Sequence, residues 1–248
     1  MNHLSCPHCQ SSQIKRNGHT HHRKQNHQCL ECGRQFVADS QFINDETKEL
    51  IKRLLLERLS LSGICRATGV SLRWLLTFIA ALYDTLPDDL FVQSPQRTTR
   101  HVRVLRLAAE ADEMWSFVGS KANKQWLWIA LDTETKQVIA FYVGDRSQKS
   151  AQQLWKRLPV TYREYATFYT DAWAAYKEVI PASQHRVCAK STGHTNIIER
   201  FYCTLRQRFS RLARGALSFL KSMGNHIGAI KYFICHYNQE VAASITFS

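Results

Sequence analysis

Two Cys-x-x-Cys pairs near the N-terminus constrain this chain more than any other feature. Cys6 and Cys9 form the first pair, and Cys29 and Cys32 form the second. Two residues between cysteines let both sulfurs reach one ion, and two such pairs supply the four thiolates of a tetrahedral zinc site. A redox dithiol or a disulfide pair is the alternative reading. We expect structural zinc, because four protein ligands leave no open position for chemistry.

The segment around these cysteines, residues 1–42, is rich in His, Cys, Gln and Asn and poor in aliphatic residues. It cannot build a hydrophobic core of its own, so we expect the metal to stabilise a small zinc-binding module. The segment also holds histidines that are spare ligand candidates. With four cysteines present, we expect these to be solvated or to face phosphate: His8, His19, His21, His22 and His27.

The charge balance predicts a polyanionic partner. The chain has 33 Lys and Arg against 20 Asp and Glu, a net charge of +13. Such an excess favours DNA or RNA binding, although a basic protein without such a partner has this composition too. No run approaches the roughly 18 apolar residues of a membrane helix, and the N-terminus lacks an apolar signal core. We therefore expect a cytoplasmic protein with no membrane partner.

Residues 43–86 are expected to be helical. A short helix should end at Gly69, Val70 should pack inward, and Ser71 should cap the next helix. This is the layout of a DNA-binding helix-turn-helix, in which Arg73 lies early in the reading helix. A plain helical hairpin gives the same pattern, so the DNA-reading role depends on the basic context.

A basic linker is predicted over residues 87–103, between the helical region and the rest of the chain. Its prolines, aspartates and threonines do not continue a helix or a strand. Its end and the first residues beyond it carry arginines with no acid among them, which we expect to contact DNA: Arg97, Arg100, Arg103 and Arg106.

From residue 104 to residue 248 the pattern changes to that of a mixed α/β domain. Three strand-like segments form a meander, and then helix, strand, helix, strand and helix follow. This is the element order of the ribonuclease-H-like fold. The expected strands are 107–120, 125–131, 137–143, 167–170 and 185–187, and the expected helices are 147–158, one from 172, 196–212 and 217–238.

That fold brings carboxylates from distant elements to one divalent metal site, and three acids occupy the matching places. They are Asp112 in the first strand, Asp171 at the end of the fourth, and Glu199 in a later helix. Three carboxylates suffice for two Mg²⁺ ions. Glu113 is the alternative to Asp112. Two structural alternatives remain open: Asp171 could cap the following helix, and Glu199 could belong to a capping box with Asn196.

Basic residues follow Glu199 with few interruptions. Arg206 lies seven residues on, two helical turns, and so shares the face of Glu199. An arginine there can clamp a phosphate next to the metals, although a solvated helix face is the simpler alternative. The residues expected to contact DNA in this region are Arg200, Arg206, Arg208 and Arg211.

These motifs together resemble full-length transposases of the bacterial insertion-sequence-one family. The resemblance covers nearly the whole chain. It runs through both cysteine pairs, the Gly69-Val-Ser71 turn, Asp112-Glu-Met-Trp-Ser-Phe-Val-Gly119, Trp126-Leu-Trp-Ile-Ala130, Gly144-Asp-Arg-Ser147, Tyr169-Thr-Asp-Ala-Trp173, Asn196-Ile-Ile-Glu-Arg200 and Tyr237-Asn238.

The resemblance implies a zinc finger, a helix-turn-helix and an Asp-Asp-Glu catalytic domain, with the catalytic roles on Asp112, Asp171 and Glu199. It implies binding of terminal inverted repeats, cleavage that frees a 3′-hydroxyl, and attack of that hydroxyl on target DNA. We expect a nucleoid-associated homo-oligomer on DNA. A repressor with an inactive nuclease-like domain is the alternative function. Gly215-Ala216 and Leu220 depart from the family, in a segment expected to be more basic.

Overall fold

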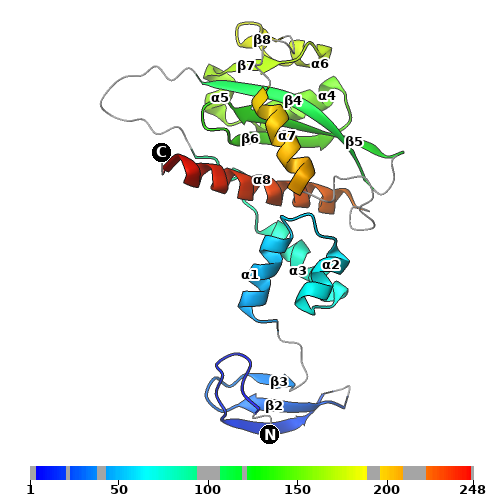
Figure 1. Cartoon of the computed structure of the whole chain (residues 1–248), viewed down its shortest axis with the longest axis vertical. Coiled ribbons are helices and arrows are strands. Elements are labelled where there is room, and N and C mark those ends of the chain that lie inside the picture. The colour runs from blue at the N-terminus through cyan, green and yellow to red at the C-terminus, as the bar shows by residue number, and fades with distance from the viewer. Residues whose placement is uncertain are drawn as a thin grey trace. The chain divides into compact units, whose positions relative to one another are not determined.

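A computed structural model describes residues 4–20, 23–37, 43–93, 107–118, 122–188, 196–208 and 222–246 (Figure 1). The chain divides into two compact units, Met1–Lys52 and Arg53–Ser248. Several predicted positions lie outside the described residues: Arg97, Arg100, Arg103, Arg106, Arg211, Gly215, Ala216 and Leu220.

The first unit contains a small antiparallel sheet in the order β1-β2-β3. Its strands are β1 (Ile14–His19), β2 (Gln25–Cys29) and β3 (Gln35–Val37). Between residues 4 and 37, the buried side chains among those described are Cys6, His27 and Cys29. Two of these three are cysteines of the Cys-x-x-Cys pairs, so this sheet has almost no apolar core to stabilise it.

Three helices follow: α1 (Asp45–Leu54), which crosses the boundary between the units, α2 (Leu61–Thr68) and α3 (Leu72–Asp84). The Oγ of Ser60 accepts from the N–H of Gly63 and caps α2. Gly69, with φ of 73°, ends α2 in the left-handed conformation that glycine tolerates. The Oγ of Ser71 then accepts from the N–H of Trp74. The predicted helix boundaries are therefore present.

α2 and α3 are bent by 111° with respect to each other. Taken together, the two helices have the length and apolar composition of a membrane span with a bend in it. No single helix in the described part of the chain has both.

The second unit holds a five-stranded mixed sheet in the order β6-β5-β4-β7-β8. β4, β5 and β6 form an antiparallel meander, and β7 and β8 pair parallel. This arrangement fits the predicted ribonuclease-H-like domain. The strands are β4 (Ala108–Phe117), β5 (Lys124–Asp132), β6 (Val138–Gly144), β7 (Thr167–Thr170) and β8 (His185–Val187).

Helices cover both faces of this sheet (Figure 1). On one face lie α4 (Gln148–Arg157), α5 (Val160–Tyr165) and α6 (Ala174–Lys177). On the other lie α7 (Asn196–Arg208) and α8 (Met223–Thr246). Alternate residues of β4 serve the two cores: Met114 belongs to the α7–α8 side, and Ala109 and Ala111 to the α4–α6 side.

Two helices differ from the prediction. α5 is additional, because its six residues are too few for helical periodicity to appear in the sequence. α8 continues to Thr246, beyond the predicted end at residue 238. The described part of α8 begins at Met223, whereas the predicted start at 217 falls outside the described residues.

Candidate active site and cysteine cluster

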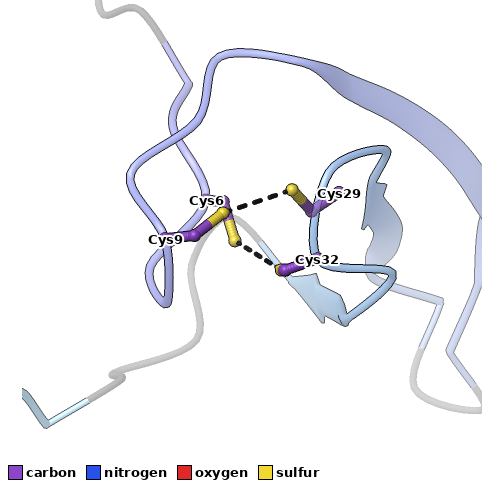
Figure 2. A group of neighbouring side chains, drawn as sticks. All are labelled: Cys6, Cys9, Cys29 and Cys32. Atoms are coloured by element: carbon purple, nitrogen blue, oxygen red, sulfur yellow. Dashed lines mark hydrogen bonds between the residues drawn. The ribbon is translucent and has the colours of Figure 1, made fainter.

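The four cysteines of the N-terminal pairs converge on one point (Figure 2). All four sulfurs lie within 4.8 Å of one another. The Sγ atoms of Cys6 and Cys32 are 3.7 Å apart, and those of Cys9 and Cys29 are 3.5 Å apart. A tetrahedron with Zn–S bonds of about 2.3 Å has sulfurs about 3.8 Å apart, so the spacing fits zinc.

Both Cys-x-x-Cys turns have the same local design. Backbone N–H groups of Cys9 and His8 lower the pKa of Cys6 to about 7. The equivalent N–H groups of Cys32 and Glu31 lower the pKa of Cys29. N–H groups directed at a sulfur stabilise the thiolate, which is the form that binds metal. Gly33, directly after the second pair, has a positive φ of 71°, a conformation that glycine adopts without strain.

A second cluster is acidic and lies in the second unit. Carboxylate oxygens of Asp112, Glu113 and Asp171 all lie within 4.8 Å of one another. β4 pairs parallel with β7, and Glu110 lies opposite Tyr169. Asp112 lies two residues beyond Glu110 on β4, and Asp171 directly follows the end of β7, so the parallel pairing of the two strands brings these acids to the same edge of the sheet.

The charge in this cluster is poorly compensated at Asp112. Burial is the largest cause that raises the pKa of Asp112, to about 7, and the negative charges of Glu113, Asp171 and Glu199 add to the shift. Close carboxylates that repel one another in a half-buried site are relieved by a bound cation. Asp112 and Asp171 therefore fit a hard divalent cation.

Glu113 differs from its two neighbours because protein groups already bind it. Arg146 donates from Nε to Oε1 of Glu113 at 2.8 Å, and its Nη2 lies 2.7 Å from the same oxygen. The hydroxyl of Tyr176 donates to Oε2 at 3.0 Å. Burial raises the pKa of Glu113, and these hydrogen bonds oppose the shift. Both oxygens of Glu113 have partners, which makes this residue a supporting group in the cluster.

Glu199 lies in the first turn of α7, is exposed, and is not one of the three clustered acids. Its charge still contributes to the raised pKa of Asp112. Two contacts attach α7 to β4 around it. The N–H of Ile198 donates to Oε2 of Glu110 at 2.8 Å, and the hydroxyl of Tyr202 donates to the backbone oxygen of Asp112 at 2.8 Å.

The predicted DNA-contacting residues fall into two groups where the structure describes them. Arg73, Arg200 and Arg206 are exposed. Arg208 instead pairs with Glu240, with Nη1 and Oε2 2.8 Å apart, and lies 3.9 Å from Glu57. The DNA roles of all four remain predictions, and Arg208 would have to exchange these partners for phosphate.

Sequence reasoning missed three neighbours of the candidate site: Glu110, Arg146 and Tyr176. Glu110 carries a charge between two alanines of the strand, which signals in the sequence that it has a buried partner. Arg146 lies in the Gly144-Asp-Arg-Ser147 motif, whose purpose the sequence does not reveal. No pattern identifies Tyr176.

The family model described as IS1 transposase matches residues 105–239, more than half of the chain. The chain belongs to the IS1 transposase family. The matched range contains the acidic cluster, Glu199 and Arg146. This transposase is 38% identical over 132 residues to the insertion element iso-IS1n protein InsB of Shigella dysenteriae, covering 52% of this chain and 95% of that protein.

Other comparisons agree or add little. The insertion element IS1 4 protein InsB of Escherichia coli (strain K12) is 32% identical over 148 residues, covering 58% of the transposase and 86% of that protein. Among solved structures, the Mos1 strand transfer complex aligns with 82% of this chain and 78% of that chain at 11% identity. Its TM-score of 0.28 is too low to support an argument.

Proposed function

We propose that this DNA transposase cleaves the ends of its element and joins them to target DNA at a divalent metal site made by Asp112, Asp171 and Glu199. The observation that supports the proposal most directly is that carboxylate oxygens of Asp112, on β4, and Asp171, directly after the neighbouring strand β7, lie within 4.8 Å of each other. Membership of the IS1 transposase family supplies the reaction class. The alternative, a repressor with an inactive nuclease-like domain, is not favoured by these comparisons.

Each residue of the site would have a role that depends on its position. Asp112 and Asp171 would hold Mg²⁺ through carboxylate oxygens, the ligands that hard cations prefer. When bound, two such ions stabilise the attacking and leaving oxygens of an in-line phosphoryl displacement. No covalent protein nucleophile is required. Glu113 would keep its ion pair with Arg146 and support the two aspartates.

Glu199 would complete the ligand set from α7. Support comes from two contacts that attach α7 to β4, one just before Glu199 in the helix and one just after it. The N–H of Ile198 donates to Glu110, and the hydroxyl of Tyr202 donates to the backbone oxygen of Asp112. The influence of Glu199 on the pKa of Asp112 also indicates electrostatic proximity. A substrate phosphate and bound cations would draw this exposed carboxylate toward the aspartates.

Binding of the terminal inverted repeats would fall to the N-terminal half. We assign structural zinc to Cys6, Cys9, Cys29 and Cys32, and base or phosphate contact to Arg73 at the start of α3. The linker arginines and the exposed Arg200 and Arg206 would neutralise backbone phosphates near the cut. Pairing two element ends calls for more than one protomer, so we propose a homo-oligomer on DNA.

Single amide substitutions test the metal site. Asp112→Asn, Asp171→Asn and Glu199→Gln should each abolish cleavage and strand transfer on labelled intact and pre-nicked ends, because an amide cannot neutralise a divalent ion. End binding should persist, since it depends on distant basic surfaces. Glu164→Gln, an exposed carboxylate on α5, is the matched control. Near-normal cleavage by Glu199→Gln would remove Glu199 from the site.

A further inference from the structure

Arg146 makes an unusual set of contacts beside the acidic cluster. Its guanidinium contacts two indole rings, with Cζ 4.6 Å from the ring centre of Trp126 and 3.9 Å from that of Trp173. Its edge binds Oε1 of Glu113. One side chain thus connects β4, β5 and the segment that follows β7.

The backbone that presents Arg146 is itself firmly held. Oδ1 of Asp145 accepts from the hydroxyls of Ser147 and Ser150, both at 2.5 Å. The backbone oxygen of Asp145 accepts from Nε1 of Trp128 at 2.9 Å. A Cβ at Gly144 would lie 2.6 Å from Cε1 of Tyr142 and 2.8 Å from Oγ of Ser150, so any larger residue would displace these side chains. The backbone turn that carries Arg146 therefore has little conformational freedom.

Trp173 connects Arg146 to Asp171. The backbone N–H of Trp173 donates to Oδ1 of Asp171 at 2.9 Å, two residues apart in sequence. Movement of the Trp173 ring away from Arg146 would displace the same short segment that carries Asp171. Glu113, the other partner of Arg146, is the immediate neighbour of Asp112 on β4.

We propose that Arg146 is a positioning residue of the active site, which sets the spacing of Asp112 and Asp171 for a divalent cation through Glu113 and Trp173. This inference rests on the metal role given above to the two aspartates. A guanidinium suits the task because it is planar, always charged, and able to stack and hydrogen-bond at once. Groups that orient metal ligands in this way typically change metal affinity by about 10–100-fold.

A direct phosphate contact is the competing role, because the side chain of Arg146 is 37% exposed. The observed contacts disfavour it. Nε and Nη2 both contact Oε1 of Glu113, and the guanidinium also lies over the rings of Trp126 and Trp173. A phosphate would have to displace the partner that already neutralises the charge.

The test measures Mn²⁺ affinity of the full-length, zinc-loaded protein without DNA, by calorimetry. Arg146→Lys keeps the charge but loses the planar stack and the Nε donor, and should weaken Mn²⁺ binding about 10-fold. Trp173→Leu should weaken it in the same direction, and Trp173→Phe, which keeps a ring face, should restore most of the affinity. The melting temperature of each variant shows whether the fold is kept.

Arg157→Lys is the matched control. Arg157 also stacks on an aromatic ring, with Cζ 4.8 Å from the Tyr142 ring centre, and donates to a backbone oxygen at 3.2 Å, but binds no clustered acid. This variant should bind Mn²⁺ as the parent protein does. A similar loss in Arg157→Lys would make the effect on Mn²⁺ general and overturn the inference.

Asp112→Asn distinguishes failure of the proposed metal site from failure of the positioning role of Arg146. If it binds Mn²⁺ like the parent protein, the proposed metal site fails. If it loses Mn²⁺ while Arg146→Lys and Trp173→Leu keep full affinity, the metal site stands and the positioning role of Arg146 is overturned. Unchanged Mn²⁺ affinity together with weaker DNA binding in Arg146→Lys would assign the side chain to phosphate instead.

Discussion

Glu110 is a buried charged side chain near the start of β4, and its position has a clear physical reason. It is 2% exposed and accepts a hydrogen bond from the N–H of Ile198, near the start of α7. The first N–H groups of a helix have no partner within the helix, and an anion there also meets the positive end of the helix dipole. Burial raises the pKa of Glu110, and N–H groups of Ile197 and Ile198 oppose that shift.

Replacing Glu110 by Ala should lower the free energy of unfolding by about 2 kcal/mol, because it leaves buried N–H groups without an acceptor. Cleavage should fall as well, since the first turn of α7 carries Glu199. Glu110→Gln keeps an acceptor oxygen and should recover part of both losses. Urea unfolding and the cleavage assay would measure the two effects, and equal values for Glu110→Ala and the parent protein would contradict the capping role.

The acidic residues show how far single positions can be predicted. The roles of Asp112 and Asp171 can be predicted from the sequence because each lies where an expected strand presents a ligand. The pairing of β4 with β7 brings the two strands side by side. The pairing of Glu113 with Arg146 is not readable, because the residues are 33 positions apart and meet only through tertiary packing. Neighbouring acids on one strand look alike in sequence, although strand alternation gives them different partners.

Element α8 is joined to the sheet by one fully buried amide. Nδ2 of Asn238 donates to the backbone oxygens of Leu90 and Val138, both at 2.9 Å, and Oδ1 accepts from the N–H of Val138 at 2.8 Å. Asn238 is 0% exposed. It satisfies backbone groups of β6 that would otherwise have no partner at this edge of the sheet.

Asn238→Ala should therefore cost about 3 kcal/mol of unfolding free energy, from lost hydrogen bonds and the buried Val138 groups left behind. Gln239→Ala, the exposed amide at the next position, should change it by less than about 0.5 kcal/mol. Denaturant unfolding of both variants checks this. A small loss at Asn238 would mean that water replaces the amide.

His226 gives α8 a pH dependence. It is buried, its Nε2 lies 3.1 Å from Oγ of Ser116, and burial lowers its pKa to about 4. The unfolded chain, with a histidine pKa of about 6.5, binds more protons between these values. Stability contributed by neutral His226 is thus complete above pH 6.5 and is lost as pH falls toward 4.

Between pH 7 and 5 this loss should reach about 2 kcal/mol. His226→Gln cannot titrate and should show a correspondingly flatter stability profile. His236→Gln, a partly exposed histidine on the same helix, should keep the loss of the parent protein. Urea titrations at several pH values supply the comparison, and parallel profiles for His226→Gln and the parent would exclude His226 as the source.

Elements were more predictable than their packing. The meander of β4 to β6 is evident from runs of Val, Ile and aromatic residues, and the caps at Ser60, Gly69 and Ser71 fix α2 and α3. α5 follows Pro159 for six residues, too few to show a period. The end of α8 is missed because no glycine or proline marks it in the sequence.

At the scale of the molecule, the two compact units depend on different forces. The second unit buries two clusters of large apolar side chains, one on each face of its sheet. Between residues 4 and 37 of the first unit, the buried side chains among those described are Cys6, Cys29 and His27, and the sulfurs of the four clustered cysteines fit a metal. An apolar core persists without metal, whereas a thiolate-metal cluster does not. Removal of zinc should therefore affect the two units unequally.

Cys29→Ser removes one ligand of the cluster, and we expect it to unfold β1–β3 without loss of the mixed sheet. Hydrogen exchange should show amide protection lost in residues 14–37 and retained in residues 107–188, and bound zinc should fall below one ion per chain. Cys203→Ser, an exposed thiol on α7, is the matched control and should change neither. Affinity for the element ends should fall in Cys29→Ser, most clearly at high salt, because phosphate contacts from the rest of this +13 chain are then screened. Full protection of β1–β3 after loss of zinc would show that the small sheet is stable through its own packing, and would leave the cysteine cluster without a structural role.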